Sequence, residues 1–379
     1  MFKNKKILIL AILVVGGLLI SFSLLFQKIK PKEERIEKPQ MTQEERIPPK
    51  KELTSEEEIA KREISKPVDK KQEGEKLNEE AVKQEVMRAI DRIKHICLET
   101  DDLEAIGFGT MKEAGTIFKI GKPAIPILLK VLEDRNEDWK VRFFMSEILK
   151  EIPNEKIEPL IEIFQDKEEK ELLRRSVAST LGAWGNKKAV PFLIQGLQEA
   201  SADFRLTIIN ALGRLKDKRA VQSLSNFLDD PEVGMPAVRA LGNIGSKEAL
   251  ELLIKKLNED KKSGFKNQIT DRAVVHALSK IGGEKAEDIL INILNDKEAA
   301  ALRIEAAMGL GKMKSKKSIS YLIEALEEED ELLQIKSAEA LFKMGVTSAI
   351  PEIKKAIEKS RDNYTKEVLS HLLRKLEKE

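Results

Sequence analysis

The amino-acid sequence predicts an all-α fold, an α-solenoid in which short helices stack in pairs. Three observations predict it: apolar residues recur three and four positions apart through most of the chain, a leucine-like residue returns at a nearly constant period, and the composition is rich in charge but poor in aromatic rings. Charged residues make up 35% of the chain and aromatic residues 4%. Such usage suits exposed helices and argues against strands.

Residues 205–229 show the repeating unit in its most regular form. One apolar helical series ends at Leu215, a charged turn follows, and a second apolar series begins at Val221. Neither helix can bury its apolar face alone, so the unit must stack on others like it. The copies align on a marker residue that closes each first helix: Ile117, Leu149, Leu181, Leu212, Leu241, Leu278, Leu310 and Leu341. Eight such markers predict about eight helix pairs.

The N-terminal part has a different character. Residues 1–6 are basic, and residues 7–26 contain no charged side chain. A helix of that length spans a hydrocarbon core of about 30 Å, so we expect an uncleaved membrane anchor. The alternative is a cleaved signal peptide, but no small-x-small cleavage site follows the apolar run. Residues 27–80, rich in charge and proline, predict a disordered tether. We expect the rest of the chain to lie outside the cytoplasm.

Two capping helices are expected to close the array. Residues 81–100 form the N-terminal cap, with Asn78 as its N-cap residue, and residues 361–379 form the C-terminal cap. A terminal repeat needs such a cover because its outer face has no neighbour. The repeat array itself is expected over residues 101–360.

Several copies share a recognisable pattern, LGAWGNKKAVPFLIQGL from Leu181, LGRLKDKRAVQSLSNFL from Leu212 and LGNIGSKEALELLIKKL from Leu241. This pattern resembles the HEAT-repeat family, in the short bacterial form also seen in phycocyanobilin lyases. The resemblance implies a right-handed α-solenoid of about eight HEAT-like helix pairs. It also implies protein binding, the main use of this family. It implies nothing more specific, because a fold does not specify a function.

Recurring residues within the units have physical explanations. Glycines at 121, 182, 213, 242 and 311 lie near the ends of first helices, where a positive φ or close packing is useful. Pro126, Pro191 and Pro351 suit the first turn of a second helix. Arginines recur seven positions before the marker, and acids such as Asp166 and Asp296 end the preceding unit. The resemblance implies that these arginines form a stacking ladder, with anion binding as the alternative: Arg142, Arg174, Arg205 and Arg303.

Two units are irregular. The fifth comes early and begins with the run DDPEVGMP from Asp229, so its first helix must be short or begin at Pro236. The sixth comes late because of an insertion at residues 260–267. An insertion in a regular scaffold can form a bend or a binding loop, or it can be neutral.

Catalytic and metal-binding patterns are absent from the sequence. His95, His276 and His371 are far apart, and each is expected to be a half-buried helix residue. Deoxyhypusine hydroxylase resembles this architecture but uses His-Glu pairs for iron, and no histidine here precedes glutamate. Cys97 has no basic neighbour that would activate it. We therefore expect no catalytic residue, no cofactor, no metal and no small-molecule substrate.

The charge balance argues against nucleic-acid binding. The net charge is +2, and the array lacks the basic stripe that phosphate contacts need. We expect the second helices to form an inner surface of mixed polarity that binds a protein or peptide, although its aromatic residues could instead pack between repeats. The candidate partner-binding residues are Phe192, Asn226, Lys255, Lys256, Phe265, Asn292, Tyr321, Glu324 and Lys355.

The predicted function is a membrane-anchored scaffold for protein interaction, without catalysis. Two alternatives remain open. A lyase-like or chaperone-like enzyme on the same repeats would have a deep pocket with converging polar groups. A purely structural envelope spacer would have no discrete ligand.

Overall fold

The computed structural model describes residues 70–265 and 268–378, and within them it contains helices joined by turns and no strand. The chain divides into two compact units, Met1–Ala124 and Ile125–Glu379. The membrane anchor expected at residues 7–26 and most of the tether lie outside the described residues. No helix in the described part is long and apolar enough to cross a membrane.

The described part of the first unit is a helical hairpin. Helices α3 (Lys70–Glu99) and α4 (Leu103–Ile120) are followed by the 3₁₀ turn η1 (Lys122–Ala124), and buried Ile90, Ile93 and Ile117 lie in the core of the hairpin. The prediction that the tether extends to residue 80 is wrong, because α3 begins at Lys70. Asn78 lies inside the helix rather than at its N-cap, since the Lys/Glu-rich residues before it are strong helix formers.

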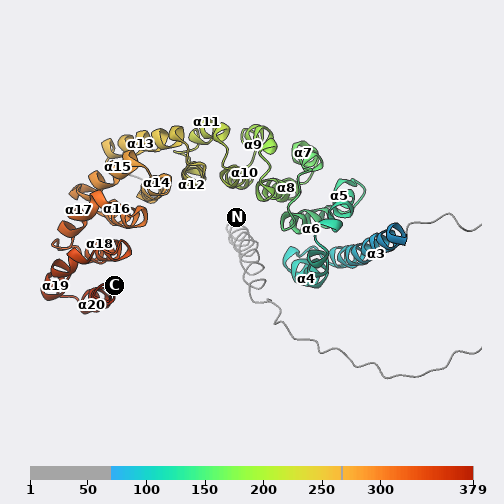
Figure 1. The fold of residues 1–379 in the computed structure, drawn as a ribbon. Helices are drawn as coiled ribbons and strands as arrows, with labels where there is room; N and C mark the ends of the chain where they lie inside the picture. Colours follow the sequence, from blue (N-terminus) through green and yellow to red (C-terminus); the bar gives the residue numbers. More distant parts are fainter. Residues whose placement is uncertain (1–69, 266–267, 379) are drawn as a thin grey trace, which may run out of the picture. The chain divides into compact units, whose positions relative to one another are not determined.

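The second unit consists of two rows of helices, shown in Figure 1. One row holds the helices that contain the marker residues, together with the C-terminal helix: α6 (Trp139–Lys150), α8 (Glu171–Trp184), α10 (Ala202–Leu215), α12 (Gly234–Ile244), α14 (Gln268–Ile281), α16 (Ala300–Met313), α18 (Glu331–Lys343) and α20 (Asn363–Leu376). We call this the marker row.

The other row holds the second helices of the units: α5 (Ile125–Glu133), α7 (Glu158–Gln165), α9 (Val190–Gly196), α11 (Val221–Ser225), α13 (Lys247–Lys262), α15 (Glu284–Leu294), α17 (Ile319–Ala325) and α19 (Ile350–Lys359). Short 3₁₀ turns precede five of them, namely η1 before α5, η2 (Lys187–Ala189), η3 (Lys218–Ala220), η5 (Lys316–Ser318) and η6 (Thr347–Ala349), while η4 (Lys297–Ala299) precedes α16. We call this the second row.

Within Ile125–Glu379, the marker row lies on the inner side of the curve and the second row on the outer side (Figure 1). Successive helices of the marker row pack directly against each other, whereas successive helices of the second row meet at few positions. The expectation that the second helices form the inner surface is therefore wrong. The sequence periodicity shows which side of each helix is buried, but it does not show which row is packed more tightly.

Close helix contacts in the marker row explain most of the recurring glycines. A Cβ added to Gly182 of α8 would lie 2.7 Å from the Cα and Cβ of Ala211 in α10. The same relation of a glycine to an alanine of the next helix recurs at Gly213–Ala240, Gly242–Ala277 and Gly311–Ala340. These glycines are required by close backbone approach rather than by φ, because no side chain fits between the helices.

A second set of residues ends the marker-row helices in the left-handed region. Four positions after the marker, these helices have glycine with positive φ at Gly185, Gly245, Gly282 and Gly345, and Gly121 after α4 also has positive φ. In two units a lysine takes this conformation instead, Lys216 with φ 50° and Lys314 with φ 55°. Side chains other than glycine adopt this region at a cost, so these two lysines are locally unfavourable.

The two irregular units fit into the same rows. Helix α12 begins at Gly234 and has 11 residues, which makes it short, as the early marker requires. The insertion lengthens α13 to 16 residues, and the chain then turns through Gly264 and Phe265, both with positive φ. The insertion therefore extends a second-row helix and its exit turn.

Candidate functional site

The inner face of the second unit is built from the same positions of each marker-row helix. At 100° per residue, the positions nine, six and two before the marker, and two after it, lie opposite the buried marker side chain. The marker leucines are fully buried. We call the opposite side of the marker-row helices the inner face.

Large exposed apolar side chains in the described part of Ile125–Glu379 lie on the marker row. They are Leu172 on α8, Met235 on α12, Ile269 on α14, Met308 on α16, Leu332 on α18 and Tyr364 on α20, with exposures from 38 to 70%. The second-row helices have no side chain in this group. The first five occupy inner-face positions, so the inner face has the apolar surface that partner binding usually requires.

Basic side chains line one end of the inner face. Two residues after the marker, Arg214, Lys280, Lys312 and Lys343 are exposed. Lys280 bonds to Asn243 at 2.5 Å. Arg239, two residues before the marker in α12, is also exposed on the inner face. The inner face thus combines apolar contacts toward the N-terminal ends of the helices with positive charge toward their C-terminal ends.

The candidate partner-binding residues from the sequence lie elsewhere. Phe192, Asn226, Lys255, Lys256, Asn292, Tyr321, Glu324 and Lys355 are on the second row, or at its helix ends, and Phe265 lies in the turn after α13. Lys256 is buried, with its Nζ 2.6 Å from Asp260 and 2.7 Å from Asp229. Lys355 pairs with Glu327. The recurring glycine and alanine of the first helices were the sequence signal that could have identified the tightly packed inner row.

The ladder arginines join the two rows. Each donates its Nε–H to the carbonyl at or beside the end of the preceding second-row helix, in Arg142 to Leu132 at 2.7 Å and in Arg303 to Leu294 at 2.6 Å. Arg174 and Arg205 do the same to Phe164 and Leu197. This contact satisfies a helix-terminal carbonyl that has no partner within its own helix.

The guanidinium groups of these arginines also contact acidic or aromatic side chains. Arg142 forms a bidentate pair with Glu169, at 2.8 and 2.6 Å, and Arg303 pairs with both oxygens of Glu328. The guanidinium of Arg174 lies over the ring of Phe204, and that of Arg205 over Phe227, at 5.1 and 5.2 Å from the ring centres. Arg205 also approaches Asp230 at 3.8 Å. The acids expected from the sequence bind other bases: Asp166 pairs with Arg135 and Asp296 with Lys261.

Three marker-row helices that contain a marker residue lack the ladder arginine. Its position is held by Gly234 in α12, Asp271 in α14 and Gln334 in α18. The Asp271 carboxyl is fully buried beside Asp260, and Lys256 enters from α13 to meet Asp260. Both oxygens of Asp271 and Oδ2 of Asp260 have no hydrogen-bond donor. Burial, with the neighbouring Asp260 carboxyl, raises the pKa of Asp271 to about 7.

The histidines are exposed and the cysteine is buried. His95 is exposed and approaches Glu99 at 3.2 Å, and His276 and His371 are also exposed. The expectation of half-buried histidines is therefore wrong. Cys97 is buried. In the part of the chain that the structure describes, no group of three or more His, Cys, Asp and Glu side chains is placed to hold a metal ion.

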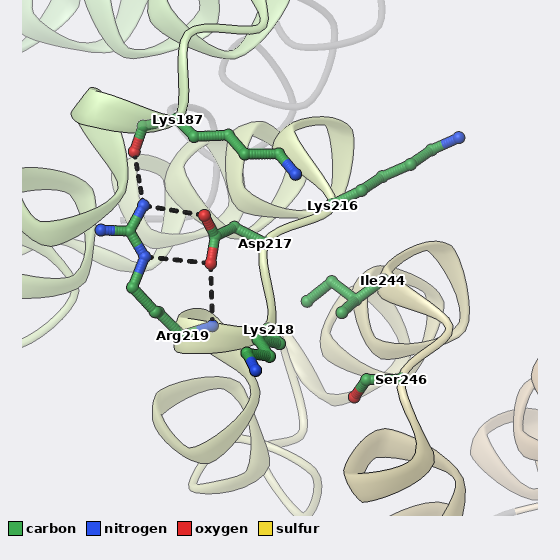
Figure 2. A pocket seen from close by; sticks show the side chains of 7 residues that line it. All are labelled: Lys187, Lys216, Asp217, Lys218, Arg219, Ile244 and Ser246. Atoms are coloured by element: carbon green, nitrogen blue, oxygen red, sulfur yellow. Dashed lines mark hydrogen bonds and ion pairs between the residues drawn. The ribbon is translucent and has the colours of Figure 1, made fainter.

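One hollow of about 440 Å³ lies at the turns between the two rows, and Figure 2 shows its lining. Arg219 binds the Asp217 carboxylate through Nε at 3.0 Å and Nη2 at 2.7 Å, and it also donates to the Lys187 carbonyl at 2.8 Å. The Arg219 hydrogen bond lowers the pKa of Asp217 to about 2. Lys216 extends away from this pair (Figure 2). The lining contains more basic than acidic side chains.

A second hollow of about 510 Å³ lies between α3 and α4 in the first unit. Asp91, Arg92, His95 and Glu113 contribute to its lining. Arg92 approaches Glu113 at 3.7 Å.

Comparison with known proteins identifies the repeats. Residues 157–235, 190–270, 228–301 and 287–374 match the family described as HEAT repeats, which together cover more than half of the chain. No curated protein matches the chain. The family assignment therefore rests on the repeats themselves.

Solved structures similar to this chain include three with low sequence identity. The complex of CpcE and CpcF of phycocyanin lyase from Nostoc sp. PCC7120 is 20% identical, with 66% of this chain and 94% of that chain covered and a TM-score of 0.38. Human deoxyhypusine hydroxylase in complex with glycerol is 18% identical, with 69% and 99% covered and a TM-score of 0.30. An engineered protein is 17% identical, with 86% and 99% covered and a TM-score of 0.40.

Proposed function

Because the chain belongs to the HEAT repeats family, we propose that it is a non-catalytic scaffold that binds a protein partner on its inner face. The observation that carries this proposal is the distribution of exposed apolar side chains in Ile125–Glu379. Leu172, Met235, Met308 and Leu332 occupy inner-face positions of separate marker-row helices. A row of apolar contacts on neighbouring helices suits an elongated segment better than a small molecule.

The charge of the inner face indicates the kind of segment. The apolar side chains lie beside Arg214, Arg239, Lys312 and Lys343, all exposed. An amphipathic helix or extended peptide with acidic side chains along one edge would satisfy both features. Positive charge at the rim of such an interface steers the partner and sets its orientation, while the buried apolar contacts supply most of the affinity.

We also propose that residues 7–26 anchor the protein in a membrane and that the array lies outside the cytoplasm. The support is the absence of charge over twenty residues with basic residues before them. Cysteine labelling in intact cells tests the orientation. With Cys97 buried, a Glu329→Cys variant should react with an impermeant thiol reagent. Labelling only after cell lysis would place the array on the cytoplasmic side.

Affinity capture from detergent extracts tests the binding face. The full-length protein serves as bait, alongside the variants Met308→Glu and Leu332→Glu, which place a charge on the inner face. A protein captured by the wild type should be lost from both variants, since each change buries a carboxylate in an apolar contact. Circular dichroism checks that the variants stay folded.

The matched control is Asn292→Glu, which adds the same charge at an exposed position of the second-row helix α15. Capture of the partner should be unchanged in this variant. If Asn292→Glu abolished capture and Met308→Glu did not, the binding surface would be the second row, and the proposal would be overturned.

A further inference from the structure

The turns that lead from the marker row to the second row are strongly basic in three units. One cluster contains Lys187, Lys188, Lys216, Lys218 and Arg219, and a second contains Lys314, Lys316 and Lys317. All eight side chains are exposed. We call these two clusters the basic edge. All the turns of this kind lie at the same end of their helices, so the basic edge is one border of the repeat unit.

The opposite border is acidic in two units. The turns that lead from the second row to the next marker-row helix contain Asp229, Asp230 and Glu232 in one unit, and residues 327–331, EEEDE, in another. In these units positive and negative charge are therefore separated along the length of the helices, although the end of α13 places exposed Lys261 and Lys262 on the same border as the acids. Counting charges along the sequence hides this separation, because the two kinds of turn alternate.

Two local features are unfavourable for the isolated protein. Lys187, Lys188, Lys218, Arg219, Lys316 and Lys317 lie in the 3₁₀ turns that begin second-row helices, where the helix dipole favours anions rather than cations. Lys216 and Lys314 hold a left-handed φ that other units give to glycine. Residues that break local rules together are expected at functional sites.

Most of this charge has no internal partner. Arg219 is bound to Asp217, and Lys317 to Asp288, but the side chains of Lys187, Lys188, Lys216, Lys218, Lys314 and Lys316 have no ion pair in the described structure. Asp217 stays ionised at neutral pH because the hydrogen bond from Arg219 lowers its pKa to about 2. It offsets only one of the charges in its cluster.

We infer that the basic edge binds the surface of a membrane that contains anionic lipids, through the phosphates of their headgroups. Exposed lysines on three turns of the same border, α8 to α9, α10 to α11 and α16 to α17, match an extended, flat array of negative charge. The acidic border turns away from the same surface, so the separated charges orient the array. The uncharged residues 7–26 at the N-terminus fit a chain that works beside a membrane.

Nucleic acid is the weaker alternative on these observations. Single strands are bound by aromatic side chains stacked on bases, and the large exposed apolar side chains of the described residues include one aromatic, Tyr364 on α20. The basic edge consists of turns and presents no helix that could enter a major groove. Lysine, which acts as a point charge, suits lipid phosphates without a fixed geometry.

Vesicle binding by the full-length protein tests the inference. Binding is measured to vesicles of phosphatidylcholine alone and of phosphatidylcholine mixed with phosphatidylglycerol. The N-terminal residues are the same in every variant, so a change in the ratio of the two affinities between variants reports the contribution of the substituted lysines. A lysine near an anionic surface contributes on the order of fivefold in affinity. Replacing Lys187, Lys188, Lys218 and Lys316 by Gln should lower the ratio by at least about tenfold, and added salt should lower the wild-type ratio in the same direction.

The control replaces Lys130, Lys255, Lys262 and Lys359 by Gln, which are exposed and lie on or just after the second-row helices. This variant has the same net charge as the edge variant and should retain the wild-type ratio. Equal losses in the two variants would overturn the inference. Met308→Glu should leave vesicle binding unchanged, which separates this result from failure of the inner-face proposal.

A second measurement reports orientation. A fluorophore attached at Lys314→Cys should be quenched by lipids that carry a headgroup quencher, whereas one at Glu329→Cys, on the acidic border, should not. Equal quenching at both sites would overturn the inference. So would tighter binding of a double-stranded oligonucleotide that the edge variant loses, or self-association that the edge variant loses in sedimentation, since either would assign the edge to another partner.

Discussion

Ser279 of α14 faces Gly309 of α16. In the other contacts of this kind in the marker row, the earlier helix provides a glycine and the next helix provides an alanine. A Cβ on Gly309 would lie 2.8 Å from the Cβ of Ser279. In this contact the glycine lies on the later helix and the larger residue on the earlier one. The two helices therefore still approach closely, although the residues are reversed.

This exchange predicts a coupled pair of substitutions. Gly309→Ala alone should destabilise the protein by about 1–3 kcal/mol, because overpacking a tight contact forces the helices apart. Ser279→Gly combined with Gly309→Ala recreates the arrangement of Gly242 and Ala277, and it should recover most of the loss. Urea unfolding of the two single variants and the double variant gives the coupling free energy. Simple additivity would show that the two residues do not share the contact.

Lys216 predicts a stabilising substitution. Its φ of 50° is one that glycine adopts freely, so Lys216→Gly should stabilise the protein by about 0.5–1 kcal/mol. Lys218→Gly is the control, since Lys218 lies in a 3₁₀ turn and should gain nothing from glycine. Thermal unfolding measures both. A Lys216→Gly variant that is less stable than the wild type would refute the strain argument.

Asp271 predicts a loss of stability with rising pH. Its pKa is raised from 3.8 to about 7 in the folded protein, so the folded state holds the proton more tightly than the unfolded chain does. The resulting stabilisation is complete below pH 3.8 and is lost as the pH rises through about 7. Asp271→Asn should therefore raise the unfolding midpoint more at pH 8 than at pH 5.

Asp217 should contribute to stability with the opposite pH dependence, which provides a comparison. Its pKa is lowered to about 2, so its contribution is present above pH 3.8 and is lost as the pH falls through about 2. Asp217→Asn should lower the unfolding midpoint at pH 8. Identical responses of the two variants between pH 5 and pH 8 would mean that Asp271 is not protonated in the folded protein.

Arg303 predicts a large effect for a ladder residue. It donates to the Leu294 carbonyl and pairs with Glu328 while 8% of its side chain is exposed. Arg303→Ala should cost about 2–3 kcal/mol, since it leaves a helix-terminal carbonyl and a carboxylate without a partner. Arg272→Ala breaks an ion pair to Glu305 with 53% of the arginine exposed and should cost less than about 1 kcal/mol. Denaturant midpoints compare the two.

Local sequence patterns determined the helices, their order and their buried sides. The spacing of apolar residues depends on the helical period alone, so the marker leucines, and the prolines in the first turns of α9 and α19, could be placed without coordinates. The ladder arginines could be picked out for the same reason, as they recur at one distance from the marker.

Only the tertiary structure decided which row faces inward and which partners the charged residues take. The inner row is set by contacts such as Gly182 with Ala211, which join residues of different units. The arginine partners Glu169, in the turn before α8, and Phe204, in α10, are ones that the sequence spacing does not distinguish. The sequence predicts a binding surface on the second row, whereas the structure places the inner face on the marker row. Burial periodicity is a property of one helix, but curvature depends on how closely successive helices approach.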